Sequence, residues 1–591
     1  MTYFRRPVVM GTHGVVTSGH YLASVAGLRI MEHGGNAIDA AAAMGFCLNL
    51  LEPQQNGLGG EVPVLVYSAR EKRPFAISGM GWSPKAFTIG WCREHGIEMI
   101  PGDGYLPACV PAVAGTWAAA LARFGTMSFA QVLQPAIDLA ENGFPMYDDL
   151  HDFIQGQVAT FTGKYPSTGQ LYLPGGRVPE IGEVFRNPDL ARTLKLLCKA
   201  ESSAARKGRI AGIEAARDAF YKGEIAERLV DFITRHPVDD ASGGPHTGLL
   251  SLDDMAEWHA AVEEPLQVDY RGLTVHKCSS WTQGPVFLQQ LTLLEGYDLA
   301  AMGPCSADYI HTWVECAKLA FADREAYYGD PLLDRVPFDV LLSKDYAARR
   351  RQLIGREASM EMRPGDAGRG LPDYATFDVL ADSRRALSAA GDNERRHDGD
   401  TTHLDAVDRE GNMVAATPSG GWIQSSPVIS GLGFPLGTRG QMFYLNPRRP
   451  NALAPRKRPR ATLTPSLVTK DGRPHLVFGT PGGDCQDQWT LQFFLNYVDF
   501  GMNLQEALDA PEFATAHFPS SFYPRTALPG WIDLDSRIPP AVVEELKRRG
   551  HRVGSMREQP VKMMAIRYDA GRGVILGGTR STGNTTCALA W

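Results

Sequence analysis

The chain has no long apolar run and no excess of positive charge. Its longest apolar stretch, from Ala40 to Leu51, is interrupted by Gly45 and Asn49 and is shorter than the roughly 20 residues of a membrane-spanning helix. The formal net charge of -7 over 591 residues offers no basic surface to nucleic acid or to an anionic membrane. The first residues carry charge but no apolar run follows them, so no secretory signal is predicted. We therefore expect a cytoplasmic protein without nucleic-acid or membrane partners.

The sequence also lacks the short motifs of several enzyme classes. Nine cysteines are scattered from Cys47 to Cys587 without the close spacing of a zinc or redox pair. Their odd number does not suit a complete disulfide framework, so a reducing compartment is expected. There is no His-Glu helix motif, no Gly-rich phosphate loop and no Gly-x-Ser-x-Gly turn. These absences argue against a metalloenzyme, and we expect no metal and no cofactor.

What is present is an ordinary globular composition, with 44% hydrophobic and 21% charged residues. The apolar spacing predicts helices over residues 20–33 and 36–51, followed by a glycine turn at 57–60 and a strand over 62–67. Residues 306–328 repeat apolar side chains at helical spacing, which predicts an amphipathic helix. The mixture of helices and strands indicates a fold of the α+β type.

The clearest change of composition lies just before Thr401. Residues 383–400 are polar, charged and nearly free of large apolar side chains, so this segment cannot bury enough surface to order itself. Alone, it would be read as a surface linker. Residues 401–408 then alternate as a strand, 410–412 form a tight turn, and 413–417 return as a second strand. A mobile segment that ends at a threonine on a core hairpin is what a self-cleaving protein requires.

A threonine at a new N-terminus has the chemistry of a nucleophile. Its hydroxyl needs a base, and its own α-amine, with a pKa of about 7.7–8.0, can supply one near working pH. Before cleavage, the Thr401 hydroxyl can attack the carbonyl of Asp400 to form an ester that water hydrolyses. The expected cut lies between Asp400 and Thr401, at the sequence Asp-Thr-Thr-His.

This motif resembles the start of the small subunit in the γ-glutamyltransferase family, which reads Thr-Thr-His followed by Val-Val-Asp. Here Thr401, Thr402 and His403 are followed by Val407 and Asp408. The similarity extends from about Gly11 over nearly the whole chain. Further family-like segments occur in the expected order at 35–41, 53–60, 124–127, 134–136, 269–272, 322–330, 450–452, 457–459, 479–483 and 506–511.

The resemblance implies a four-layer αββα sandwich of the N-terminal-nucleophile hydrolase type, formed jointly by segments 1–400 and 401–591. Thr401 resembles the nucleophile, and Gly482 with Gly483 resembles the loop whose amides form the oxyanion hole. Ser419 occupies the place of a hydroxyl that orients the nucleophile, although a simple turn serine is the alternative. His403 is expected to be structural, since the α-amine already supplies the base.

The glutamyl-recognition residues of the family are altered. Residues 78–85 contain no arginine for the α-carboxylate, and the family's Ser-Ser pair is replaced by Ala461-Thr462. Its asparagine near the nucleophile becomes Gly421, and its acidic residues become Phe443-Tyr444. The Arg439-Gly440 pair and its surroundings instead resemble bacterial relatives near oxamate amidohydrolase. There Arg439 would pair bidentately with a substrate carboxylate, unless it is a structural arginine. The candidate substrate-binding residues are Arg439, Thr462 and Tyr444.

These features predict hydrolysis of an amide, or transfer of its acyl group, through an acyl ester on Thr401. A small carboxylate-bearing amide is the expected substrate. The alternatives are a true glutathione hydrolase and an acylase for larger amides, resembling the cephalosporin acylases, with Trp82, Trp422 and Tyr444 lining an apolar pocket. A non-catalytic binding protein is disfavoured by the retained Thr401 and the glycine pair. The two fragments are expected to remain together, and the processed protomer is a candidate homodimer.

Overall fold

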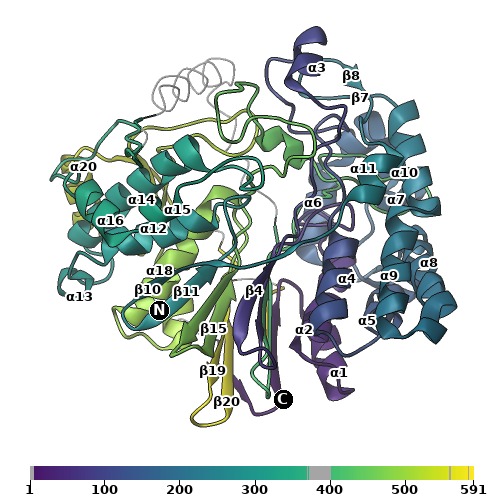
Figure 1. The fold of residues 1–591 in the computed structure, drawn as a ribbon, viewed down its shortest axis with the longest axis horizontal. Helices are drawn as coiled ribbons and strands as arrows, with labels where there is room; N and C mark the ends of the chain where they lie inside the picture. The colour runs from purple at the N-terminus through teal and green to yellow at the C-terminus, as the bar shows by residue number, and fades with distance from the viewer. Residues whose placement is uncertain (1–5, 369, 372–400, 558–560, 583–584) are drawn as a thin grey trace.

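The computed structural model describes residues 6–368, 370–371, 401–557, 561–582 and 585–591. The expected linker 383–400, including Asp400, lies outside the described residues. Two seven-stranded antiparallel sheets face each other, and helices cover the outer face of each one (Figure 1). This is the expected αββα sandwich.

Strands from distant parts of the chain are neighbours in both sheets. The first sheet has the order β21 (Cys587–Ala590), β2 (Gly14–Ser18), β12 (Leu404–Asp408), β13 (Met413–Ala416), β3 (Val64–Ser68), β4 (Arg73–Ile77) and β9 (Val262–Glu263). The second has the order β1 (Val9–Gly11), β20 (Val574–Thr579), β19 (Met564–Asp569), β15 (Arg473–Gly479), β14 (Ser466–Lys470), β11 (Leu273–Lys277) and β10 (Leu266–Tyr270). Both sheets thus contain strands from before and after residue 401, so a cut there leaves two fragments that share both sheets.

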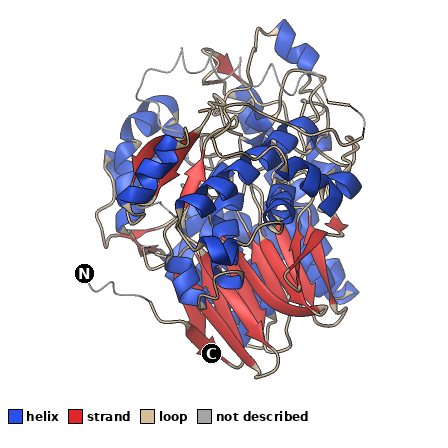
Figure 2. Ribbon diagram, turned by 90° about the vertical axis from the view of Figure 1, so that its left-hand side faces the viewer, coloured by secondary structure: helices blue, strands red, loops and turns tan. Residues whose placement is uncertain are grey.

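The outer layers are built from long helices (Figures 1 and 2). The layer on the first sheet includes α1 (Tyr21–Glu32), α2 (Ala37–Leu51), α4 (Val113–Phe124), α5 (Phe129–Asn142), α8 (Pro188–Ala204), α9 (Arg209–Tyr221) and α10 (Glu224–Arg235). The layer on the second sheet includes α12 (Gly284–Leu294), α14 (Ala307–Tyr327), α16 (Lys344–Arg351), α18 (Gln486–Val498) and α20 (Pro540–Arg548). No helix in the described part of the chain is both long and apolar enough to cross a membrane.

Strand alternation decides which core each side chain enters. On β12, Leu404 and Ala406 belong to the core beneath the first helical layer. Val407 belongs to the core between the sheets, where Val477 of β15 meets it from the opposite sheet. Because side chains two apart share a face, the odd-numbered residues that precede Val407 also point toward the second sheet.

The structure confirms most of the predicted elements and corrects one. The helix predicted at 36–51 is α2, which begins with a capping box between Asn36 and Asp39. The helix predicted at 306–328 is α14, but the expectation that it is amphipathic was wrong. Its polar side chains are buried too, because they pair inside the protein, as Lys318 does with Glu315 at 2.6 Å. The face of α14 that was predicted to be solvated therefore carries internal ion pairs.

Candidate active site

Thr401 lies just before β12 at the edge of the space between the two sheets. The ladder of β12 begins at Leu404, later than the predicted start at 401, and Thr401 forms an isolated antiparallel bridge with Ser419. The strand β15 ends opposite this point. A Cβ added to Gly479, its last residue, would lie 2.2 Å from the ring of His403. His403 is two residues from Thr401 in the chain. The end of β15, where the glycine-rich loop begins, therefore lies close to the segment that carries Thr401.

The side chain of Thr401 is fully buried and contacts a second hydroxyl. Its Oγ1 lies 3.0 Å from Oγ of Ser419. Its backbone N–H donates to Oε1 of Gln55 at 3.1 Å. The structure thus brings the predicted nucleophile and the predicted orienting serine together, and it adds Gln55 from the loop after α2.

Arg439 is buried beside Ser419 and forms hydrogen bonds within this cluster. The guanidinium is buried, its Nη2 donates to Ser419 Oγ, and its Nε donates to Glu61 Oε1. Its Cζ lies 4.8 Å from the ring centre of Trp422 and 5.5 Å from that of Phe522. Burial raises the pKa of the Glu61 carboxyl, and the charge of Arg439 opposes that rise. The bidentate pairing expected between Arg439 and a substrate is restricted, because two of its nitrogens already face Glu61 and Ser419.

These contacts give the hydrogen bonds a direction. A guanidinium has only donors, so Ser419 must use a lone pair to accept from Arg439. Ser419 can then donate its hydroxyl hydrogen to Thr401 Oγ1 at 3.0 Å. A hydroxyl that receives such a bond is stabilised when it loses its own proton. The cluster therefore favours Thr401 as a nucleophile whose proton leaves toward its own nitrogen.

The predicted oxyanion loop has the backbone that its role requires. Gly482 has φ 128° and Gly483 has φ 54°, a region that favours glycine. A Cβ on Gly482 would lie 2.2 Å from the ring of Trp489. Within the described residues, neither glycine amide donates a hydrogen bond to another residue. Two such amides side by side form a site for a negatively charged oxygen.

Asp484 anchors this loop to both halves of the chain. One carboxylate oxygen accepts from Arg324 Nη1 of α14 at 2.5 Å and from Ser521 Oγ at 2.7 Å. The other accepts from the Ser521 backbone N–H at 2.8 Å. All three residues are buried. The anchoring acid and arginine were not predicted from the sequence, although Asp484 directly follows the glycine pair.

His403 has the structural role that was expected. Its Nδ1 lies 2.9 Å from Thr417 Oγ1 and its Nε2 lies 2.9 Å from Asp405 Oδ1. Thr17 donates to the second oxygen of Asp405 at 3.0 Å. Both ring nitrogens are therefore used inside the fold. These contacts hold β12 against its neighbouring strands, two residues from Thr401.

The three aromatic residues proposed to line one apolar pocket lie in different surroundings. The Tyr444 hydroxyl donates to Glu325 at 2.6 Å, whereas Trp422 packs against Arg439. Trp82 packs against the helical core of the first sheet and donates to the Asp254 carbonyl. Among the described residues, the ring contact of Trp422 is with Phe522, at 6.2 Å between centroids, and no ring contact joins it to Trp82 or Tyr444.

Thr462 differs from Tyr444 in keeping a polar atom available. Its Oγ1 is buried and has no hydrogen-bond partner among the described residues. Arg439 Nη1 has the same property. Both atoms are therefore available to hydrogen-bond a ligand or water.

The described residues contain no group of three or more metal-ligating side chains in one place. All nine cysteines are free thiols. The expected homodimer and cytoplasmic location stay predictions.

A buried threonine beside a serine, a left-handed glycine loop and an αββα sandwich together define an N-terminal-nucleophile hydrolase. The family model for γ-glutamyltranspeptidase matches residues 23–587. The chain is 31% identical to the glutathione hydrolase-like YwrD proenzyme of Bacillus subtilis, over 98% of each chain. It is 32% identical to the acylase ACY 1 proenzyme of Pseudomonas sp. strain SE83, over 92% of this chain and 88% of that one.

Among solved structures, cephalosporin acylase from Bacillus halodurans is 29% identical, with a TM-score of 0.83, and the match covers 100% of this chain and 98% of that chain. The structure described as LmbA2991HD is 43% identical, with a TM-score of 0.93, over 99% of this chain and 100% of that one. The protein belongs to the γ-glutamyltranspeptidase family. It is accordingly a self-processing enzyme that hydrolyses amides or transfers their acyl groups.

Proposed function

We propose that the chain cuts itself between Asp400 and Thr401 and then uses Thr401 as an N-terminal nucleophile on a small carboxylate-bearing amide. The contact between Thr401 Oγ1 and Ser419 Oγ, with Arg439 donating behind it, carries this proposal. In this arrangement the threonine hydroxyl accepts a hydrogen bond from Ser419 and gives its own proton to the α-amine.

The reaction follows from that arrangement. Thr401 Oγ1 attacks the substrate carbonyl carbon, the α-amine takes the hydroxyl proton, and the carbonyl electron pair moves onto oxygen. Collapse of this intermediate breaks the C–N bond, and the ammonium passes the proton to the leaving nitrogen. Water, or an acceptor amine, then attacks the Thr401 ester, and its proton returns through the amine to Thr401 Oγ1.

Gly482 and Gly483 are proposed to hold the negative oxygen of the intermediate. Their amides lie on a loop that Asp484 fixes in place. Loss of one such donor costs on the order of 10²–10³ in rate. Because donors that are already in place need no reorganisation during the reaction, this loop stabilises the transition state more than the bound substrate.

The choice of acyl group rests on what the pocket residues offer. Arg439 Nη1 and Thr462 Oγ1 are buried polar atoms without a partner among the described residues, and each can donate a hydrogen bond to a carboxylate oxygen. Tyr444, the third candidate, already uses its hydroxyl on Glu325. An amino-acid head also needs partners for its ammonium, and the positions that supply them in the family hold Gly421 and Phe443 here. Burying that ammonium unpaired costs several kcal/mol.

The test is a comparison of kcat/KM on processed enzyme for oxamate and for γ-glutamyl-p-nitroanilide. We expect weak or absent turnover of the γ-glutamyl donor. Thr462→Val, which keeps the side-chain shape, should raise KM for the carboxylate substrate more than it lowers kcat. Efficient γ-glutamyl turnover that is indifferent to both Thr462→Val and Arg439→Ala would replace this proposal with a glutathione hydrolase.

An acylase for larger amides is the second candidate. It is favoured by the full-length similarity to cephalosporin acylase and to ACY 1, and by Trp422 beside the nucleophile cluster. A cephalosporin amide in the same assay decides between the two. Preferential turnover of the larger amide would show that the chain is an acylase for larger amides.

A further inference from the structure

Gln55 touches the atom on which the proposed mechanism depends. It lies in the loop after α2, on the other side of the predicted cut from Ser419. Its side-chain Oε1 accepts the N–H of Thr401 at 3.1 Å. That nitrogen is a peptide amide in the uncut chain and becomes the α-amine after cleavage. Gln55 is therefore placed to contact both the precursor and the enzyme.

The loop that carries Gln55 is held firmly. The backbone N–H of Gln55 donates to the Glu52 carbonyl at 2.9 Å, and the Gln55 carbonyl accepts a hydrogen bond from Nε1 of Trp422 at 2.8 Å. The next residue, Asn56, forms a backbone bridge with Gly420. The loop is thus bonded to the same segment that carries Ser419, so the two contacts to Thr401 come from segments that are joined to each other.

We propose that Gln55 is a positioning residue that holds the α-amine of Thr401 and turns its lone pair toward the hydroxyl. This inference rests on the proposed function. An amide oxygen can only accept, so it takes one hydrogen of the amine and limits rotation about the N–Cα bond. Ser419 donates to Thr401 Oγ1 from the other side, so the two contacts together orient the threonine proton toward the amine.

The charged groups around Thr401 are paired with each other, so a contact from Gln55 can influence the basicity of the amine. The Glu61–Arg439 pair lies beyond Ser419. Glu52, whose pKa burial raises, lies behind Thr402 with Lys562 at 3.8 Å. Each of these two pairs joins opposite charges, and the His403 ring lies 2.9 Å from the Asp405 carboxylate.

His20, from the start of α1, also belongs to these surroundings, and burial, followed by the charge of Lys562, lowers its pKa to about 3. It is therefore uncharged at neutral pH and adds no further charge near the amine. Gln55 is in hydrogen-bond contact with the nitrogen itself, at 3.1 Å.

The discriminating variant is Gln55→Glu. A carboxylate in contact with the amine favours the ammonium form and should raise its pKa by about 1–3 units. Since only the free amine acts as base, the acid limb of the kcat/KM profile should move to higher pH by the same amount. Activity at pH 7 should fall about tenfold or more and recover at alkaline pH. Gln131→Glu, an added charge in the capping box of α5, should leave the profile unchanged.

A second readout does not depend on substrate. Cyanate carbamylates free amines, so the pH dependence of its reaction at Thr401, followed by mass spectrometry of the small fragment, reports the pKa of that amine. Gln55→Met removes the acceptor without adding charge, and should lower kcat while leaving the acid limb in place. A folded Gln55→Met chain that fails to cut itself supports the same contact in the precursor.

The proposal is overturned if Gln55→Glu leaves both the activity profile and the cyanate profile unmoved, or if Gln55→Met has wild-type kcat. Failure of the proposed function looks different. In that case Thr401→Ala retains turnover, or no cyanate-reactive threonine forms in the wild-type protein.

Discussion

Besides its proposed contact with the substrate, Arg439 neutralises Glu61 and directs Ser419, and replacing it by methionine removes both contacts. Both side chains are buried, and Arg439 Nε donates to the Glu61 carboxylate. Removing one partner of a buried ion pair costs about 3–5 kcal/mol, because the remaining charge is left uncompensated. Arg439→Met should therefore lower the free energy of unfolding by about that amount at pH 8, and should also abolish the donor to Ser419.

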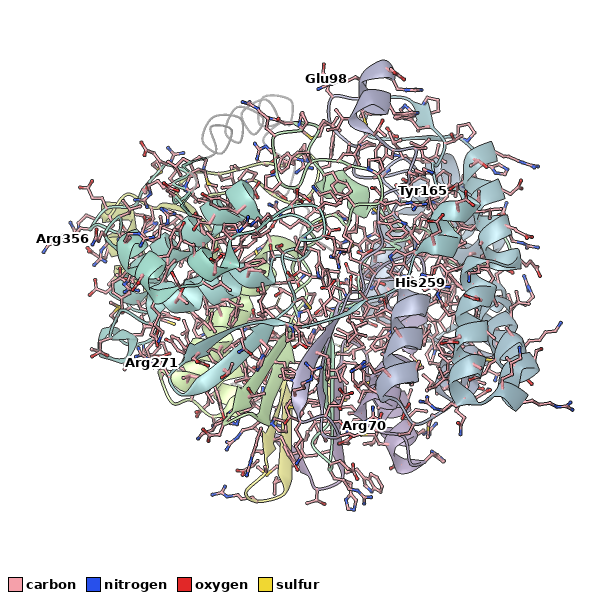
Figure 3. The ribbon with its side chains drawn as sticks, in the orientation of Figure 1. Arg70, Glu98, Tyr165, His259, Arg271 and Arg356 are labelled. Atoms are coloured by element: carbon pink, nitrogen blue, oxygen red, sulfur yellow. The ribbon has the colours of Figure 1, made fainter. Side chains whose placement is uncertain are left out.

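The pH dependence of this loss follows from Glu61. Burial raises the pKa of its carboxyl, and removing Arg439 takes away the opposing charge. A group with a raised folded-state pKa contributes stability at low pH that is lost as pH rises through that pKa. Arg439→Met should thus be nearer to wild type at pH 5 than at pH 8. Denaturant unfolding at both pH values measures this, with Arg356→Met at the exposed edge of the molecule as the control (Figure 3).

The double variant Glu61→Gln with Arg439→Met completes the test. It no longer buries an unpaired charge, so most of the stability should return. Turnover should not return, because Ser419 still lacks its donor. Recovery of both stability and kcat in the double variant would refute the directed chain from Arg439 through Ser419 to Thr401.

Three further variants test the rest of the site. Thr401→Ala should abolish both self-cleavage and turnover, and Thr401→Ser should keep part of each, as seen on denaturing gels and in activity assays. Gly482→Ala should lower kcat by on the order of 10²–10³ with little change in KM, since its Cβ would lie 2.2 Å from Trp489; unchanged kcat would remove the loop from the mechanism. Arg324→Lys should lower kcat about 10- to 100-fold by loosening Asp484, and an effect confined to KM would contradict that anchoring role.

The parts of the fold that were predictable carry a local signal. The capping box of α2 joins residues three apart, Asn36 and Asp39, and the β12–β13 hairpin is marked by strand alternation around a glycine turn. The motif Thr401-Thr402-His403 pointed to the nucleophile through a family resemblance. In each case, the residues that carry the signal are neighbours in the sequence.

The contacts that complete the site have no such signal. Glu61 and Arg439 are 378 positions apart, and Gln55 and Thr401 are 346 positions apart. These pairs come together only because strands from both ends of the chain pair with each other. No period or spacing in the sequence indicates that pairing. The buried polar face of α14 was mispredicted for the same reason, because its partners include Asp484 in the distant glycine loop.

We propose above all that self-cleavage creates the nucleophile at Thr401. N-terminal sequencing of the smaller fragment from freshly folded, active protein tests it most directly, with activity measured beside the fraction of chain cut. The predicted result is a fragment of 191 residues (591 − 400) that begins Thr-Thr-His-Leu, with turnover rising in proportion to its appearance. Full activity in an uncut chain, or a fragment that begins at another residue, would contradict the account.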